Sequence, residues 1–334
     1  MAEAPKVAVV GVTGVVGREM LRVLEQREFR LSSLVPVASI RSAGQKVRFR
    51  GVEQEVLPIA PNVFEDVDIA LFSAGSSTSQ RWSPVAASKG ATVIDNSSAF
   101  RMDPDVPLCI PEINLEATRR RPKGIIANPN CSTIQMLVAL APLHRESRVR
   151  RIIVSTYQAI SGSGARAVEA FKKQQQDLLR NEAVETSSLK GQLAGSLLMH
   201  WTVDTASGYQ EEELKMVHET RKILDDPDIA VSPTCVRVPV ECGHAESIAI
   251  ETAEHISLER AQELLRNAPG VCFVEDFEGG NYPTPLDVVG RDEVYVGRLR
   301  ADLGNPSGLL LWVVADNLRK GAALNAVQIA EAMV

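Results

Sequence analysis

The first apolar segment of the chain is followed by three glycines at the spacing G-x-x-G-x-x-G. Residues 7–10 read Val-Ala-Val-Val, and the glycines come directly after them, ahead of a helical pattern over 18–26. Glycines in this place permit a tight turn and let a pyrophosphate approach the amide groups at the start of the helix. The pattern predicts a dinucleotide-binding turn, although an ordinary strand-to-helix turn would also use glycine. The turn residues concerned are Gly11, Thr13, Gly14, Val15, Val16 and Gly17.

The order of apolar segments predicts an α/β fold. In the first third, short apolar strands alternate with helical stretches, the strands being expected at 7–10, 34–38, 69–73, 93–95 and 124–127. This alternation is typical of a doubly wound parallel sheet, so we expect an N-terminal Rossmann-like dinucleotide-binding domain.

The pattern of apolar residues changes from about residue 151. Longer β-branched runs at 151–156, 235–240, 247–252, 294–299 and 309–314 indicate an α+β domain with a mixed or antiparallel sheet. The Ala-rich end, 318–333, has apolar residues at helical spacing, and we expect it to pack back on the first domain. The predicted domains are therefore 1–129 with 315–334, and 130–314.

Composition excludes several classes of protein. A net charge of −6 and only short basic clusters argue against binding of nucleic acid, and no apolar run reaches the roughly 20 residues that span a bilayer. The five cysteines are odd in number, widely spaced and without a C-x-x-C pair, so neither a disulfide framework nor a metal cluster is indicated. We expect a cytoplasmic protein without a metal.

The loop after the second expected strand bears on the choice of dinucleotide. A site for NAD carries an acidic residue against the ribose 2′-hydroxyl, about 20 residues after the glycine turn. This loop instead offers Ser39, Arg41 and Ser42, and no carboxylate. Cationic and hydroxyl groups suit a 2′-phosphate, so the loop favours NADP; an ordinary exposed arginine is the alternative.

One cysteine stands where a helix is expected to begin. Cys131 lies in Asn-Pro-Asn-Cys-Ser-Thr (128–133), between an apolar strand and a helical run. Unpaired amide groups at a helix start favour thiolate over thiol. Cys131 is thus a candidate nucleophile, with a small buried residue in a helix cap as the alternative.

Three other segments supply what a thiolate acting on an acyl group needs. Gln158 is followed by a glycine-rich turn and could orient a carbonyl group. Arg237 could clamp a carboxylate bidentately, and His244 has a side chain suited to proton transfer near neutrality. Arg101 could meet a second anionic group. Each of these residues, taken alone, could also be structural.

Together these segments resemble the aspartate-β-semialdehyde dehydrogenases, in the form without a long insertion near the active site. The resemblance runs from end to end through the ordered motifs GVTGVVG, SIRSAG, DNSSAFRMDPDVPLCIPEIN, NPNCSTIQ, YQAISGSGARA, EEELKMVHETRKIL, RVPVECGH and DNLRKGAALNAVQIAE. It implies NADPH-dependent reductive dephosphorylation of L-β-aspartyl phosphate to aspartate β-semialdehyde, with release of inorganic phosphate. It also implies that 130–314 is the catalytic and dimerisation domain of a homodimer, with a tetramer possible.

The resemblance assigns roles by motif. It implies Cys131 as the nucleophile, Gln158 as its orienting partner, His244 as the acid/base group, Arg237 for the substrate α-carboxylate, Glu212 for the α-amino group, and Arg101 and Lys215 for the phosphate. The other residues implied are Asn130 at the substrate and Ser73, Ser161, Gly162 and Asn317 at the cofactor.

Two alternative functions remain open for this sequence. N-acetyl-γ-glutamyl-phosphate reductase performs the same chemistry on a longer, acylated substrate, but the surroundings of the cysteine and the Glu212 candidate for a free amino group argue against it. A catalytically silent paralogue that binds nucleotide is the other, and the joint presence of Cys131, Gln158, Arg237 and His244 argues against that reading.

Overall fold

The computed structural model describes residues 4–199, 201–276 and 278–334, and the chain divides into two compact units. The first unit holds 1–130 and 322–334, and the second holds 131–321. The second change of unit falls seven residues after the predicted boundary at 314, because the loop that follows residue 315 is bonded to the second unit. There, Asp316 accepts from the amide of Gly290 at 2.8 Å and Asn317 from that of Gly243 at 2.9 Å.

The first unit is built on a parallel six-stranded sheet, as the sequence predicts. Its strand order is β5-β2-β1-β6-β7-β8, and every neighbouring pair is parallel. The central strands are apolar on both faces, which is expected where helices cover both sides of a sheet. The strands are β1 (Lys6–Val10), β2 (Ser33–Ala38), β5 (Leu57–Pro58), β6 (Ile69–Phe72), β7 (Thr92–Asp95) and β8 (Ile125–Ala127).

Within the described residues, the α-helices of this unit are α1 (Val15–Gln26), α2 (Ser76–Ser88), α3 (Pro111–Asn114) and α9 (Leu324–Glu331). A hairpin of β3 (Lys46–Phe49) and β4 (Val52–Glu55) and the short helical turns η1 (Ile40–Ser42), η2 (Pro61–Phe64) and η3 (Leu115–Arg119) complete it.

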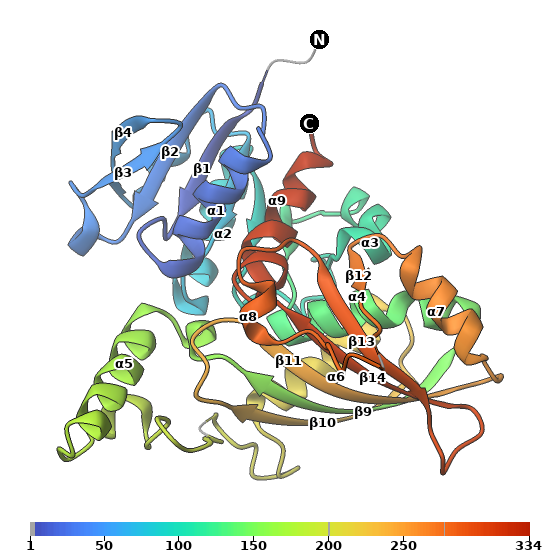
Figure 1. Cartoon of the computed structure of the whole chain (residues 1–334). Helices are drawn as coiled ribbons and strands as arrows, with labels where there is room; N and C mark the ends of the chain where they lie inside the picture. The colour runs from blue at the N-terminus through green and yellow to red at the C-terminus, as the bar shows by residue number, and fades with distance from the viewer. Residues whose placement is uncertain (1–3, 200, 277) are drawn as a thin grey trace. The chain divides into compact units, whose positions relative to one another are not determined.

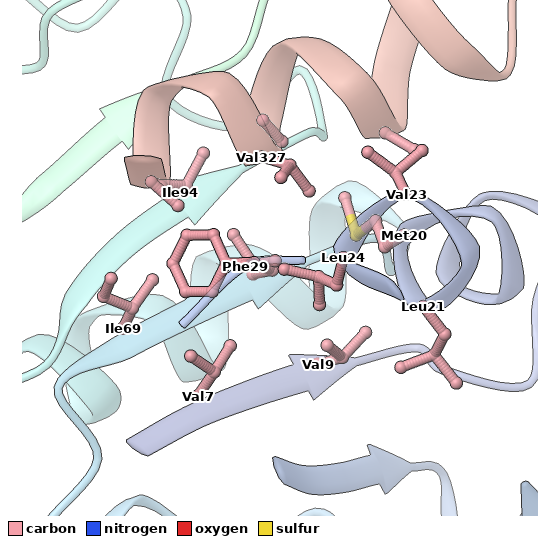
Figure 2. Packing of buried hydrophobic residues seen from close by; sticks show 14 of the residues in the cluster. Val7, Val9, Met20, Leu21, Val23, Leu24, Phe29, Ile69, Ile94 and Val327 are labelled. Atoms are coloured by element: carbon pink, nitrogen blue, oxygen red, sulfur yellow. The ribbon is translucent and has the colours of Figure 1, made fainter. Parts of the chain in front are cut away.

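The core of the first unit joins both ends of the chain. Met20 and Leu24 of α1 lie one turn apart, face the sheet and are fully buried, and Val9 of β1 and Val327 of α9 belong to the same apolar cluster. Figure 2 shows these side chains pointing toward one another. The prediction that the C-terminal segment packs on the first domain is confirmed.

The second unit carries the mixed sheet that the sequence predicts. The strand order is β10-β9-β11-β14-β13-β12, with parallel pairs at β10/β9 and β12/β13 and antiparallel pairs between the others. The strands are β9 (Val149–Gln158), β10 (Ala230–Arg237), β11 (His244–Thr252), β12 (Val271–Phe273), β13 (Val294–Ala301) and β14 (Gly308–Ala315). The predicted strand at 235–240 is wrong in both limits: β10 begins five residues earlier and ends at Arg237, where the chain turns so that the Val240 amide bonds to the Val238 carbonyl.

One face of this sheet is covered by three helices (Figure 1): α4 (Cys131–Glu146) contacts β9, β11, β13 and β14, α6 (Glu211–Ile223) contacts β10, and α7 (Leu258–Arg266) contacts β12 and β13. The other face carries apolar side chains that remain partly exposed, among them Ile153 and Tyr157, and Tyr157 packs against Trp312 with ring centroids 5.7 Å apart.

The unit also contains α5 (Ala165–Leu179), α8 (Pro285–Val288), η4 (Ile160–Ser163), η5 (Ser187–Leu189) and the π-helical turn η6 (Arg319–Ala323), which runs into the first unit. None of the helices described is long and apolar enough to cross a bilayer.

Candidate active site

The glycine turn of the first unit is sterically fixed. Gly11 has φ +85°, and a Cβ built there would lie 2.9 Å from the carbonyl oxygen of Ser73, while a Cβ at Gly17 would lie 2.2 Å from that of Gly11. Side chains are thus excluded at both positions. The turn opens α1, and Val15, Val16 and Gly17 form its first helical residues. Their amides make a surface suited to a pyrophosphate.

The residues predicted to select NADP lie at the carboxyl end of β2, the edge at which open parallel sheets bind ligands. Ser42 lies in η1, and its hydroxyl accepts from Thr13 of the glycine turn at 3.4 Å. Ser39 and Arg41 are exposed beside it, and within the described residues the Arg41 guanidinium makes no hydrogen bond or ion pair. The structure therefore brings the loop and the glycine turn together.

Arg101 is held by the main chain of the first unit. Its Nε donates to the carbonyl of Asn128 at 2.9 Å and its Nη2 to that of Asn96 at 3.0 Å. These asparagines follow β8 and β7, so the guanidinium is fixed at the carboxyl edge of the sheet. Asn130, buried and two residues further on, directly precedes Cys131. Both predicted substrate residues therefore belong to the same edge.

Cys131 is the first residue of α4, as predicted, and it forms no disulfide bond. A Cβ at Gly321 would lie 2.8 Å from the Cβ of Cys131, so only glycine fits against the cysteine at that position. Gly321 stands in the π-helical turn η6, a rare geometry that is frequent at functional sites. Sequence reasoning missed Gly321, although a glycine within an Ala-rich helical run is a signal of close approach.

Gln158 ends β9 and is buried on the face that α4 covers. Its Nε2 donates to the hydroxyl of Ser132 at 3.0 Å and approaches Oε1 of Glu212 at 3.3 Å. Ser132 is the neighbour of the cysteine in α4, and Glu212 lies in the first turn of α6. The amide therefore links the helix start that holds Cys131 to the predicted amino-group ligand.

The predicted phosphate residue Lys215 is paired with acids in this structure. Its Nζ lies 3.3 Å from Oε2 of Glu212 and 3.1 Å from Oε1 of Glu211. Burial lowers the pKa of Lys215, but the charges and hydrogen bonds of Glu212 and Glu211 outweigh burial and raise the pKa above its ordinary value. Lys215 thus stays cationic.

Arg237 and His244 both form hydrogen bonds with the main chain of Ala159. Nη1 of Arg237 donates to the carbonyl of Ala159 at 2.7 Å, and the amide of Ala159 donates to Nδ1 of His244 at 3.0 Å. Gly162 lies beside both side chains, since a Cβ there would be 3.3 Å from Nη1 of Arg237 and 3.4 Å from Nε2 of His244. Trp201 covers the guanidinium, with Cζ 4.7 Å from its ring centroid.

The pKa values of Arg237 and His244 are both shifted downward in this cluster. Burial lowers the pKa of Arg237, which the negative charges of Glu212 and then Cys131 raise in part. Burial holds the pKa of His244 well below its ordinary value, and the charge of Arg237 acts in the same direction. His244 is therefore a neutral imidazole near pH 7. Such perturbation, concentrated in one buried cluster, is typical of a catalytic site.

Asn317, Ser161 and Gly243 form a second small network in the same unit. Nδ2 of Asn317 donates to the hydroxyl of Ser161 at 2.9 Å, and Oδ1 accepts from the amide of Gly243. Gly243 directly precedes His244, so the network supports the start of β11. Three of the predicted cofactor residues, Ser161, Gly162 and Asn317, thus lie in the second unit with the catalytic cluster.

Glu246 is a buried carboxyl group that sequence reasoning missed. It follows His244 by two residues on the same face of β11 and is fully buried. Neither carboxyl oxygen makes a hydrogen bond of good geometry within the described residues, although the Gln135 amide lies beside them. Burial raises the pKa of Glu246 well above its ordinary value, and Gln135 opposes the shift. Burial therefore favours the neutral form of this carboxyl group in the folded protein.

A stability prediction follows from the direction of this shift. In the unfolded chain Glu246 titrates near the ordinary pKa of glutamate, about 4.3, whereas in the folded protein burial moves its titration to higher pH. Its contribution to stability is complete below the unfolded-state pKa and is lost as pH rises toward the folded-state pKa, by up to about 1.4 kcal/mol per pH unit. We expect Glu246→Gln to flatten the fall in stability between pH 5 and 8 in urea unfolding. The exposed control Glu254→Gln should keep the wild-type slope, and an unchanged slope in Glu246→Gln would show that Glu246 ionises in the folded protein.

The arrangement as a whole suits acyl transfer. The second unit places a thiol at a helix start, an uncharged amide, a guanidinium, a neutral imidazole and a carboxylate around one buried cluster. A thiolate can attack an acyl carbon, while a guanidinium and a carboxylate can hold the carboxylate and the amino group of an amino acid.

Comparisons with known proteins agree with this site. Family models described as "Semialdehyde dehydrogenase, NAD binding domain" and "Semialdehyde dehydrogenase, dimerisation domain" match residues 6–121 and 140–320. The aspartate-semialdehyde dehydrogenase of Aquifex aeolicus is 52% identical, with 98% of each chain covered, and that of Bacillus subtilis is 48% identical, with 100% of this chain and 98% of the relative covered. The crystal structure of aspartate semialdehyde dehydrogenase II from Vibrio cholerae, complexed with ASA, is 46% identical with a TM-score of 0.96 over 99% of this chain and 98% of that chain. The chain belongs to the aspartate-semialdehyde dehydrogenase family.

Proposed function

We propose that this protein reduces L-β-aspartyl phosphate to L-aspartate β-semialdehyde with NADPH and releases inorganic phosphate, a step in the biosynthesis of lysine, threonine and methionine. The observation that carries the proposal is the hydrogen-bonded group of Gln158, Ser132 and Glu212, which joins the helix start of Cys131 to a carboxylate suited to an α-amino group. The relatives described above support the same substrate.

The residues divide the chemistry between them. The Cys131 thiolate attacks the acyl carbon, the bond to the phosphate oxygen breaks, and a thioester remains on Cys131. Arg237 holds the α-carboxylate and Glu212 the α-amino group, while Arg101 and Lys215 address the phosphate and Asn130 lines the substrate. Gln158 orients the substrate, and His244 is the acid/base group.

The residues present also fit a dinucleotide. Side chains are excluded at Gly11 and Gly17, so a pyrophosphate can come close to the backbone amides at the start of α1. When bound, NADPH supplies the hydride that reduces the thioester carbon. Ser39, Arg41 and Ser42 would hold its 2′-phosphate, and Ser73, Ser161, Gly162 and Asn317 would lie along the rest of the cofactor.

Cofactor choice gives a direct prediction. Arg41→Ala removes a charged contact that only NADPH makes, so we expect NADPH to bind more weakly by about 1.5–3 kcal/mol, roughly 10- to 150-fold, while NADH binding is unchanged. Dissociation constants for both cofactors, measured by protein fluorescence quenching or calorimetry, test this. Lys46→Ala, on the exposed β3–β4 hairpin, is the matched control. Equal weakening of both cofactors would mean that Arg41 does not read the 2′-phosphate.

One assay separates the proposed activity from its rivals. Purified protein mixed with NADP⁺, phosphate and aspartate β-semialdehyde should produce NADPH absorbance, and N-acetylglutamate γ-semialdehyde should give little. The reverse preference would identify the acetylglutamyl reductase, and cofactor binding without turnover of either aldehyde would identify a silent paralogue.

Two copies of the chain are proposed to pair through the open face of the second-unit sheet, with a tetramer as the alternative. Ile153 is 47% exposed and Tyr157 38% exposed on that face, and exposed large apolar side chains on one surface are a feature of protein–protein interfaces. The match of 140–320 to a dimerisation domain supports this pairing. None of the five cysteines forms a disulfide bond, which supports the further proposal that the enzyme works in the reducing cytoplasm.

A further inference from the structure

The indole ring of Trp201 lies over the guanidinium group of Arg237. Cζ of the arginine is 4.7 Å from the ring centroid, which is within the range of a cation–π contact. Arg237 is buried, whereas Trp201 is half-buried and the residues that follow it, Thr202 and Val203, are exposed. The ring therefore covers a buried cation on the side where the chain meets solvent.

The chain on either side of Trp201 is bonded to the elements that carry two of the proposed substrate ligands. Leu198 exchanges two main-chain hydrogen bonds with Arg237, of 2.8 and 3.0 Å. The carbonyl of Thr202 accepts at 2.8 Å from the amide of the first residue of α6, which directly precedes Glu212. Arg237 is the proposed ligand of the α-carboxylate and Glu212 that of the α-amino group. These bonds tie Trp201 to both ends of the proposed amino-acid site.

One edge of the Arg237 guanidinium is open to a ligand. Nη1 donates to the carbonyl of Ala159 at 2.7 Å, and the ring of Trp201 covers one face. The buried Nε makes no hydrogen bond within the described residues. A buried donor without a partner is costly, and such groups are kept where a ligand completes the bond. A carboxylate that bonds to this edge at two points needs the guanidinium to stay in one plane.

Two properties of Trp201 suit the task of holding that plane. The ring occupies the space into which the guanidinium of Arg237 would turn. An aromatic ring also presents a negative face to a cation, and this attraction is larger when water is excluded. An aliphatic side chain of similar bulk would exclude water but would supply no such attraction. The two contributions can therefore be separated by substitution.

We propose that Trp201 is a positioning residue for the substrate α-carboxylate: its ring holds the guanidinium of Arg237 in the plane in which the carboxylate binds. The inference rests on the function proposed above and adds a residue to the recognition of the amino-acid end of the substrate. Because Trp201 acts through Arg237, its loss should weaken substrate binding and leave the chemical step unchanged.

The first test compares two substitutions at position 201. Trp201→Phe keeps an aromatic face, and Trp201→Leu keeps apolar bulk without one. We expect Trp201→Leu to raise KM for aspartate β-semialdehyde about tenfold, with kcat within about threefold of wild type. Trp201→Phe should keep both constants within about threefold of wild type. The proposal is wrong if the two variants have the same KM, or if Trp201→Leu lowers kcat and leaves KM unchanged.

Trp82→Leu is the matched control for the loss of an indole ring. Trp82 has the same type of contact with Arg81, whose Cζ lies 5.0 Å from the ring centroid, on α2 of the first unit. Trp82→Leu should leave both kinetic constants unchanged. The aldehyde 3-aminopropanal, which lacks the α-carboxylate, is the matched substrate, and wild type and Trp201→Leu should oxidise it equally poorly. A loss by the same factor on both aldehydes would overturn the proposal.

A binding measurement separates this inference from the proposed reaction. L-2-Aminobutyrate carries the α-amino and α-carboxylate groups but no aldehyde, so its binding requires no turnover. Its dissociation constant, measured by calorimetry on the full chain, should be about tenfold higher in Trp201→Leu than in wild type, and close to wild type in Trp201→Phe. That result would support the role of Trp201 even if no aldehyde were oxidised.

Equal dissociation constants in wild type and Trp201→Leu, or no binding of L-2-aminobutyrate to wild type, would overturn the inference whatever the activity. Thermal unfolding checks that each variant folds. If Trp201→Leu does not fold, Trp201→Met takes its place as the variant without a ring, with the same expected results.

Discussion

Cys131→Ala is expected to lower kcat by at least about 10⁴-fold while the protein remains folded and still binds NADPH. The sulfur is the proposed nucleophile, so its loss removes the covalent route. Alanine keeps the Cβ, and with it the close packing against Gly321. The glycine turn of the first unit is not touched. Single-turnover assays should show no acyl-enzyme, and fluorescence titration should give the wild-type affinity for NADPH.

A control for this variant is Cys272→Ala. Cys272 lies in β12, at the edge of the second-unit sheet, and is partly buried. Burial raises the pKa of its thiol, so Cys272 should react slowly with alkylating agents. Cys272→Ala should keep normal turnover and normal inactivation by iodoacetamide. Inactivation accompanied by modification of a cysteine other than Cys131 would contradict the assignment.

Arg237→Lys is expected to lower kcat/KM by roughly 10²–10³-fold, mainly through a higher KM. The guanidinium is fixed by Ala159 through Nη1 and covered by Trp201, and its buried Nε makes no hydrogen bond within the described residues. That leaves a planar edge for a carboxylate, which an ammonium cannot match. Losing one partner of a buried charge pair costs about 2–5 kcal/mol, the scale of this effect.

The role of Arg237 can be separated from general damage by the choice of substrate. 3-Aminopropanal is the aldehyde product without its α-carboxylate, so wild type and Arg237→Lys should oxidise it equally poorly. Arg260→Lys, in an exposed ion pair with Glu146, is the matched control and should leave both substrates unaffected. If Arg237→Lys lost activity by the same factor on both aldehydes, Arg237 would have a structural role and would not read the carboxylate.

Features that depend on neighbours in the sequence could be read from the sequence. The parallel sheet follows from short apolar strands between helical stretches, and the glycine at position 17 follows from steric crowding by Gly11 and Val12 within the same turn. The start of α4 at Cys131 follows from the asparagine-rich turn and the apolar run after it. In each case the cause is local, so spacing alone predicts the result.

Features that depend on distant contacts were decided only by the tertiary structure. Ala159 meets His244 across 85 residues and Arg237 across 78, and alanine carries no chemical signal because its backbone makes both bonds. Gly321 reaches Cys131 because η6 folds back against the start of α4. The burial that raises the pKa of Glu246 arises from α4 covering the sheet, and nothing in the segment around Glu246 distinguishes it from an exposed strand carboxylate. The sequence by itself thus determined which groups are proposed to do the chemistry, whereas packing determined their protonation and orientation, because both depend on long-range contacts and on the exclusion of water.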